Sequence, residues 1–175
     1  MPAARRPALI TAAAAVMISV LTSCASAADS SGDRTVRAEL GKRVDIRSNG
    51  SPILASMWLD SVEPVTCSES GSLPPNNGNY LAVTIVLHTT EDYEPDWGWW
   101  MSAPDFATMD EDGDETGKGV LTSCLPGHRY LPDDFYLQDA GYYGVVLLDS
   151  SSRHGTLTYR PHNMPADVPG WQWSY

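Results

Sequence analysis

An acidic stretch is the first part of this chain whose residue types could do chemistry. Ten acidic and no basic residues lie within 91–115, and every second residue of 110–114 is an aspartate. Carboxylates at this spacing around Gly113 are what a calcium loop uses. An EF-hand loop aligned on Gly113, however, needs a glutamate where Gly119 stands. The stretch therefore indicates a solvated Asp-Gly hairpin tip, with weak calcium binding as the alternative.

Three tryptophans, Trp97, Trp99 and Trp100, lie near the start of this acidic stretch. Their segment, 91–103, has no regular periodicity and carries charged neighbours, so we expect at least one indole to be partly exposed. Exposed indoles on a secreted domain anchor a protein partner or stack on sugar rings. The alternative is that the three side chains cap one end of the fold as part of its core, because tryptophan is usually highly buried.

Motifs for catalysis, metal binding and phosphate binding are missing from the sequence. It has no His-Glu-x-x-His, no Gly-x-Ser-x-Gly and no phosphate-binding loop, and its four histidines form no close pair on one strand face. We therefore expect no enzyme, no metal site and no cofactor. A hydrolase without such motifs would need a pocket that holds titratable groups with perturbed pKa values.

The amino terminus has the pattern of a secretory signal. Arg5 and Arg6 precede an uncharged, mostly apolar run at 8–20, and small residues follow it. The run is shorter and richer in alanine than a spanning helix, which needs about 20 strongly apolar residues. Residues 1–23 are therefore predicted to be a signal peptide, and the small, polar residues 24–33 a flexible tether.

Two processing outcomes are open for this signal. Leu-Thr-Ser-Cys at 21–24 resembles a lipobox, in which the Cys24 thiol is diacylated and Cys24 becomes the new amino terminus. Ala-Ser-Ala at 25–27 would suit an ordinary signal peptidase. The first outcome predicts a protein held on the extracytoplasmic face of the cell membrane by its lipid alone, and the second predicts a secreted protein.

The cysteine count agrees with lipidation. The chain has three cysteines, and modification of Cys24 leaves Cys67 and Cys124 as a pair in an oxidising compartment. A disulfide between them is the prediction, with two buried free thiols as the alternative. No Cys-x-x-Cys is present, so nothing favours a redox enzyme.

The charge of the chain excludes one class of partner. The formal net charge is -11, from 11 basic and 22 acidic residues. Loss of residues 1–23 would remove two arginines and no acid, which makes the charge -13. Such a surface repels nucleic acid and anionic membranes, so we expect neither as a partner.

The strand around which the chain is organised is predicted at 80–88. Its leucine, valine and isoleucine residues at 81, 83, 85 and 87 share one face, and turn residues precede it at 76–79. A second run, 142–148, is apolar on both faces and is the best candidate for its neighbour. We therefore place 80–88 in the centre of a sheet.

Short strands divided by turns account for the rest of 34–175. They are expected at 35–40, 44–46, 53–59, 106–110, 119–122, 155–159 and 171–175, with Pro64 ending the third run. The aromatic residues of the last strand, Trp171, Trp173 and Tyr175, are expected in the core, as is Trp58. No window has convincing helical periodicity. Seven to nine strands without helices predict one all-β domain, an antiparallel immunoglobulin-like β-sandwich.

The order of these features resembles a known family. The chain is similar to the immunoglobulin-like domain of uncharacterised bacterial lipoproteins, and to a small secreted immunogenic antigen of mycobacteria. The features that carry the likeness are a lipobox with a polar linker, a strand at 80–88, the acidic hairpin at 110–113, a Leu-Pro-Gly turn and a Gly-Val-Val strand at 144–148. The likeness covers about 35–159. This chain departs from the family at two places. Its segment 126–144 is longer than the family leads us to expect, and the Trp-Gly-Trp-Trp segment at 97–100 is not a mark of the family.

The resemblance implies an immunoglobulin-like fold and a place in the cell envelope, but no activity, because a fold does not define one. The expected function is a lipid-anchored binding module that contacts a protein or another envelope component through the Trp97–Trp100 segment. The alternative is a carbohydrate-binding module that uses the same tryptophans, with nearby acidic groups accepting hydrogen bonds from sugar hydroxyls.

Overall fold

The computed structural model describes residues 34–95 and 99–175. The predicted signal peptide at 1–23, the tether at 24–33 with Cys24, and Trp97 lie outside the described residues. The described residues form nine strands and two short 3-10 helices, and no α-helix. In chain order these are β1 (Thr35–Arg37), β2 (Val44–Ile46), β3 (Ala55–Val65), β4 (Asn79–Thr89), η2 (Ala103–Asp105), β5 (Phe106–Met109), β6 (Glu115–Gly119), η3 (Gly127–Arg129), β7 (Gly141–Ser150), β8 (Thr156–Tyr159) and β9 (Gly170–Ser174).

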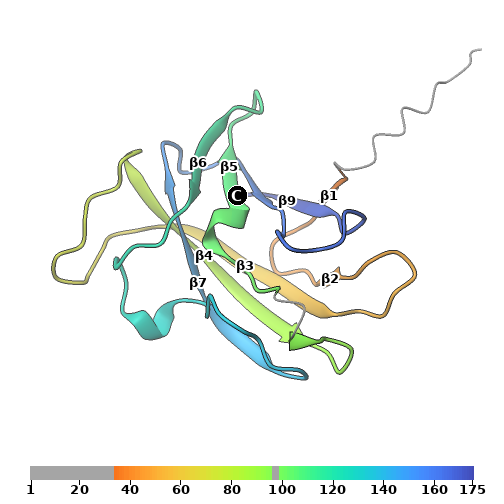
Figure 1. The fold of residues 1–175 in the computed structure, drawn as a ribbon. Coiled ribbons are helices and arrows are strands. Elements are labelled where there is room, and N and C mark those ends of the chain that lie inside the picture. The colour runs from red at the N-terminus through yellow and green to blue at the C-terminus, as the bar shows by residue number, and fades with distance from the viewer. Residues whose placement is uncertain (1–33, 96–98) are drawn as a thin grey trace, which may run out of the picture.

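The nine strands form one curled sheet in the order β1-β9-β8-β5-β6-β7-β4-β3-β2 (Figure 1). Its two halves face each other as the layers of an immunoglobulin-like β-sandwich, the fold class that the sequence predicts. Side chains from both halves pack between them in one large core cluster. Seven strand pairs are antiparallel, and β1 pairs with β9 in parallel.

β4 is central, as predicted. It pairs with β3 on one side and with β7 on the other, over almost its whole length. The four aliphatic side chains of its inner face are fully buried: Leu81, Val83, Ile85 and Leu87. Complete burial of such a side chain contributes about 1.5–3 kcal/mol relative to an exposed one, so this row is a major source of stability.

β3 is longer than the sequence predicts. The strand continues past a bulge at Asp60 and includes Pro64, which lies opposite Leu81 of β4. β2 pairs only with the first three residues of β3, so the other side of β3 at Pro64 has no partner strand in the described part of the chain. A proline costs no ladder hydrogen bond on such an edge, which is why Pro64 does not end the strand.

The acidic hairpin is present, but its second strand begins earlier than the predicted 119–122. The Asp110 carboxylate accepts the backbone N–H groups of Asp112 and Asp114 at 3.0 and 2.9 Å. Gly113 adopts the left-handed region at φ 87°, where glycine has no steric penalty. These contacts close the turn in five residues, so pairing with β5 resumes at Glu115.

Two predictions about core aromatic residues have different outcomes. Trp171 and Trp173 of β9 are buried, as expected. Trp58 is only half-buried, because it lies on the outer face of β3. There it forms a T-shaped pair with the His88 ring at 5.8 Å between ring centres, and the Arg43 guanidinium lies 5.9 Å from its ring centre. The assignment of Trp58 to the core is therefore wrong.

Candidate functional site: an aromatic surface at one end of the sandwich

Trp99 is part of the core. Its side chain is fully buried, and its ring forms T-shaped pairs with the rings of Tyr93 and Tyr136 at centre distances of 6.0 and 5.9 Å. The Tyr93 hydroxyl donates a hydrogen bond to the Trp99 carbonyl at 2.7 Å. A buried indole cannot contact an external ligand, so the alternative interpretation, a tryptophan that caps the end of the core, holds for this residue.

Trp100 lies at the surface. Successive side chains of an extended segment point in opposite directions, so the burial of Trp99 directs its neighbour outward. Trp100 is half-buried against the core and meets two other rings edge-on, Phe135 at 6.1 Å and His162 at 5.5 Å. We call these three side chains, Trp100, Phe135 and His162, the aromatic cap.

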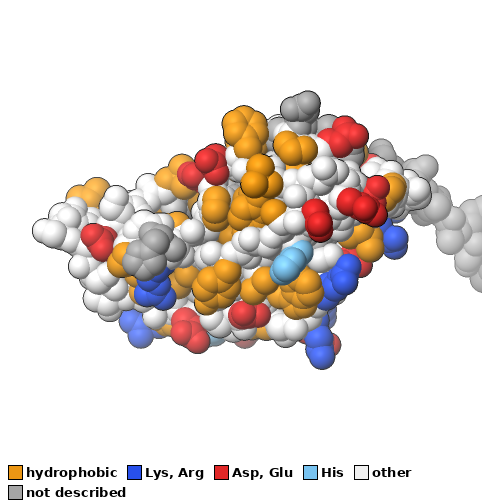
Figure 2. All heavy atoms as spheres, turned by 90° about the horizontal axis from the view of Figure 1, so that it is seen from below, with side chains coloured by type: hydrophobic (Ala, Val, Ile, Leu, Met, Phe, Trp, Pro, Cys, Tyr) orange, Lys and Arg blue, Asp and Glu red, His pale blue; other side chains and the backbone are white. Residues whose placement is uncertain are grey.

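Phe135 is the most exposed member of the aromatic cap, with 70% of its surface accessible. It belongs to the connection that leads into β7, and the acidic residues Asp133 and Asp134 precede it. Figure 2 views the side on which β7 lies in Figure 1 and shows large hydrophobic side chains gathered there, with acidic side chains around them. An exposed phenylalanine that packs against another ring is a suitable anchor for a partner.

A buried carboxylate anchors the aromatic cap. Nδ1 of His162 lies 2.8 Å from both carboxylate oxygens of Asp105, whose side chain is 7% exposed. The backbone N–H of Ser102 also donates to this carboxylate, at 3.4 Å. Burial raises the pKa of Asp105, and the hydrogen bonds from His162 and Ser102 offset part of that rise. The pair fixes the imidazole ring that Trp100 contacts.

The raised pKa of Asp105 has a measurable consequence for stability. Between its ordinary pKa, 3.8, and the raised value, the folded protein keeps a proton that the unfolded chain has released. This group therefore lowers the free energy of unfolding as pH rises through that window. The Asp105→Asn variant has no such proton to lose. The free energy of unfolding of this variant minus that of wild type should therefore increase with pH between 3.8 and the raised pKa, and stay constant at higher pH. Urea unfolding at a series of pH values tests this, and the exposed Asp134→Asn is the control; an equal trend in both variants would contradict it.

The predicted disulfide between Cys67 and Cys124 is present. It joins the loop after β3 to the connection after β6. The backbone N–H of Ser68 donates to the Cys124 carbonyl at 2.9 Å, so the two segments also pair through the backbone. The bridge lies in a second, smaller hydrophobic cluster that includes Tyr80 and Leu125.

The acidic residues do not assemble a calcium site in the described residues. No group of three or more His, Cys, Asp or Glu side chains there could hold a metal ion. Two backbone N–H groups of the hairpin turn occupy the Asp110 carboxylate, which therefore has a structural role. The described part of the chain also contains no helix long and apolar enough to cross a membrane.

No protein-family model matches the sequence, and no curated protein matches it. Solved structures share the fold. The secreted protein MPT63 of Mycobacterium tuberculosis is 12% identical, with a TM-score of 0.57 over 81% of this chain and 98% of that one. The yjhA protein of Bacillus subtilis is 14% identical, with a TM-score of 0.52 over 78% and 97%. At these identities the likeness establishes the β-sandwich fold and nothing about activity.

Proposed function

We propose that this chain is a lipid-anchored, extracytoplasmic module that binds a protein of the cell envelope through the aromatic cap and performs no catalysis. The observation that carries the proposal is the exposure of Phe135, which packs against the ring of Trp100. The Trp100 ring is itself in contact with His162. Buried Asp105 positions His162, His162 contacts Trp100, and Trp100 contacts Phe135. An anchor that is ordered before binding loses less conformational entropy when a partner arrives.

The proposed location rests on the amino-terminal pattern and is supported by the disulfide. Structural disulfides persist in oxidising compartments and are rare where thiols are kept reduced. The bridge between Cys67 and Cys124 therefore fits a domain that is exported. A lipid on Cys24 would hold that domain at the membrane, and the nine residues between Cys24 and Arg34 would span at most about 30 Å.

Replacement of the lipid-bearing cysteine tests the anchor. Cys24→Ala should move the protein from the membrane fraction to the soluble extracytoplasmic fraction, because no acyl chain can then be attached. Immunoblotting of both fractions measures the distribution, and Cys24 acylation should be visible as labelling with a fatty-acid probe. A variant that stays membrane-bound with unchanged electrophoretic mobility would show that the anchor is wrong.

Binding through the aromatic cap predicts a selective effect of one exposed residue. In envelopes that carry the full-length chain, chemical crosslinking should give one dominant adduct, and Phe135→Ala should reduce its yield at least about tenfold, as is usual for a central anchor. Tyr143→Ala is the matched control, since Tyr143 is exposed to a similar extent, 68%, on the outer face of β7. Equal loss in both variants would contradict the assignment of the site.

Carbohydrate binding is the second candidate. It is favoured by the position of Phe135 directly after the exposed carboxylates Asp133 and Asp134, because sugars need both a ring to stack on and acceptors for their hydroxyls. Soluble cell-wall glycan fragments would then shift the tryptophan fluorescence of the wild-type protein, and Phe135→Ala would abolish the shift. A fluorescence response to glycans without a protein adduct would favour this candidate over the first.

A further inference from the structure

A cavity of about 480 Å³ lies beside β7, and Phe135 is not among its lining residues. It opens where the two hydrophobic clusters of the protein meet. Met101 and Leu131 come from the large core, and Leu125 and Val145 from the cluster around the disulfide. This volume is within the range of small-molecule sites, about 300–1,000 Å³, and most of its lining is aliphatic.

Two glycines each precede a residue that lines the cavity, Val120 or Val145. A Cβ on Gly119, at the end of β6, would lie 1.7 Å from the Ala103 carbonyl oxygen, and one on Gly144 of β7 would lie 2.4 Å from the Leu131 nitrogen. At these two points the absence of a side chain lets another segment press against the sheet. The connection bonds to β7 at both ends, because the N–H groups of Val120 and Leu131 donate to the carbonyls of Leu147 and Val145 at 2.8 and 3.1 Å. The cavity is lined by residues between these two bonds.

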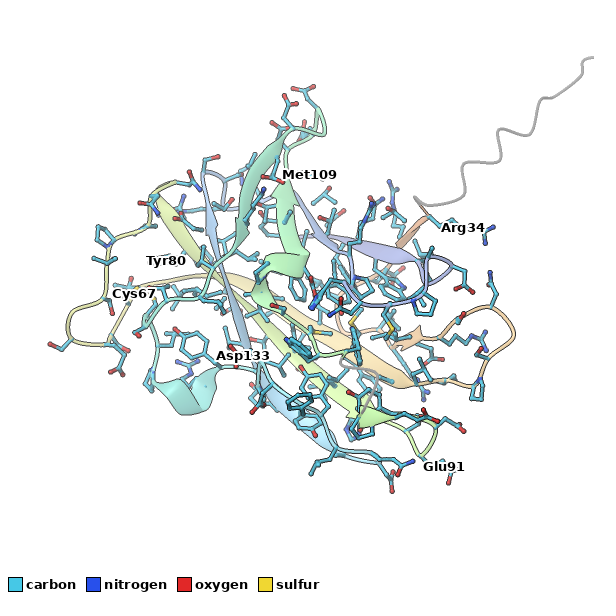
Figure 3. The ribbon with its side chains drawn as sticks, in the orientation of Figure 1. Arg34, Cys67, Tyr80, Glu91, Met109 and Asp133 are labelled. Carbon is cyan, nitrogen blue, oxygen red and sulfur yellow. A yellow bond between two sulfur atoms is a disulfide. The ribbon has the colours of Figure 1, made fainter. Side chains whose placement is uncertain are left out.

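The outer wall of the cavity is fixed in place. The Tyr130 hydroxyl accepts the N–H groups of Cys124 and Leu125 at 2.9 and 2.8 Å and donates to the Thr122 carbonyl at 2.8 Å. The disulfide of Cys124 ties the same segment to the loop after β3. Figure 3 labels Cys67 in that loop and Asp133 beside the η3 connection. Because the wall is bonded at several points, the connection keeps a fixed shape beside β7.

The charges at the cavity have one sign. Among the described lining residues the charged side chains are Glu69 and Asp133, and both are exposed to solvent at its rim. The whole chain carries a net charge of -11. An aliphatic interior with a carboxylate rim complements a ligand with an apolar chain and a cationic head, and it opposes an anionic head such as a carboxylate or phosphate.

We infer that this cavity binds a cationic amphiphile, an aliphatic chain that carries an amine or ammonium group. The chain lies against Val120 and Leu121, the lining residues whose apolar side chains are accessible, and the head group faces Glu69 and Asp133. At about 30 Å³ for each water-sized group, 480 Å³ accommodates roughly sixteen such groups, which is enough for a medium-length alkyl chain. The inference goes beyond the proposed function and uses no contact of Phe135, so the two can fail separately.

Three ligands that differ only in the head group test the charge preference. Dodecylamine, dodecanol and dodecanoate are titrated into the full-length protein by calorimetry, the two charged ligands below their micellar concentrations and dodecanol below its solubility limit. We expect the amine to bind most tightly and dodecanoate most weakly. Glu69→Gln combined with Asp133→Asn should weaken the amine about three- to tenfold and leave dodecanol unchanged. Asp134→Asn, an exposed carboxylate beside the site, is the control and should change neither.

A pair of exposed leucines tests the location. Leu121 lines the cavity and is 70% exposed, whereas Leu73 is 71% exposed and does not line it. Both tolerate serine without loss of folding, because neither is buried. Leu121→Ser should weaken the amine and the alcohol by the same factor, and Leu73→Ser should weaken neither. The inference is overturned if none of the three ligands binds, if dodecanoate binds as tightly as dodecylamine, or if the two serine variants have equal effects.

Discussion

Replacing Trp99 by alanine should lower the free energy of unfolding by about 3–5 kcal/mol, the usual cost of a large cavity in a packed core. The side chain is fully buried and contacts the rings of Tyr93 and Tyr136, neither of which can fill the space that an indole leaves. Because Tyr93 also bonds the Trp99 backbone, the variant should loosen the whole segment that leads to Trp100. Urea unfolding followed by circular dichroism measures the change.

The matched control is an exposed aromatic residue of the aromatic cap. Phe135→Ala removes an aromatic side chain that is 70% exposed, so it should change stability by less than about 0.5 kcal/mol. A large effect of Trp99→Ala with a small effect of Phe135→Ala separates the ring that supports the aromatic cap from the ring that meets a partner. Similar effects of the two variants would mean that this division is wrong.

Removal of the disulfide should cost about 4 kcal/mol. Cys67 and Cys124 are 57 residues apart, and a cross-link over that distance removes conformational entropy of this size from the unfolded chain. Cys67→Ala combined with Cys124→Ala should therefore unfold at a much lower urea concentration than wild type. The wall of the cavity beside β7 should also become mobile, since the bridge holds one side of it.

Reduction of the wild-type protein provides the control for the cysteine variants. Unfolding in the presence of dithiothreitol should shift the wild-type midpoint to that of the double variant and should leave the double variant unchanged. A destabilisation below about 1 kcal/mol would contradict the expected contribution of the bridge, because the entropic effect would then be absent or offset by strain in the folded state.

The centre of the fold could be predicted because its pattern is local. The inner face of β4 is continuous over four alternate residues, and β7 contains the apolar run 142–148, so each strand is visible without knowledge of the other. Their pairing then follows from the need to bury both. The bridge between Cys67 and Cys124 was predictable for another reason: once Cys24 is assigned to the lipid, no other pair is left.

Other features depend on neighbours that a sequence does not show. Whether Pro64 ends β3 depends on the length of β2, and the position of β6 depends on how the Asp110 carboxylate closes the turn. The parallel pairing of β1 with β9 depends on a contact between the two ends of the described chain. In each case the bounds or the pairing of a strand depend on another segment of the chain or on a hydrogen bond from a side chain.

The aromatic cap that we propose overlaps only in part with the residues that the sequence indicates. The tryptophan segment supplies one ring of the aromatic cap that we propose, Trp100. The most exposed ring of the cap is Phe135, which the sequence shows only as one aromatic residue in a long connection. The pair of Asp105 and His162 spans 57 residues, and neither residue belongs to a motif. An aromatic residue that follows two adjacent aspartates in a long loop is the one local signal that could have pointed to Phe135.

Site-specific photo-crosslinking tests the central claim, that Phe135 on a rigid sandwich meets a partner in the envelope. A photoreactive phenylalanine analogue is placed at Phe135 or, in a separate strain, at Tyr143, and living cells are irradiated. The predicted result is a discrete adduct from position 135 that disappears in a Trp100→Ala background, with none from position 143. No adduct from position 135, or the same adduct from both positions, would contradict the claim.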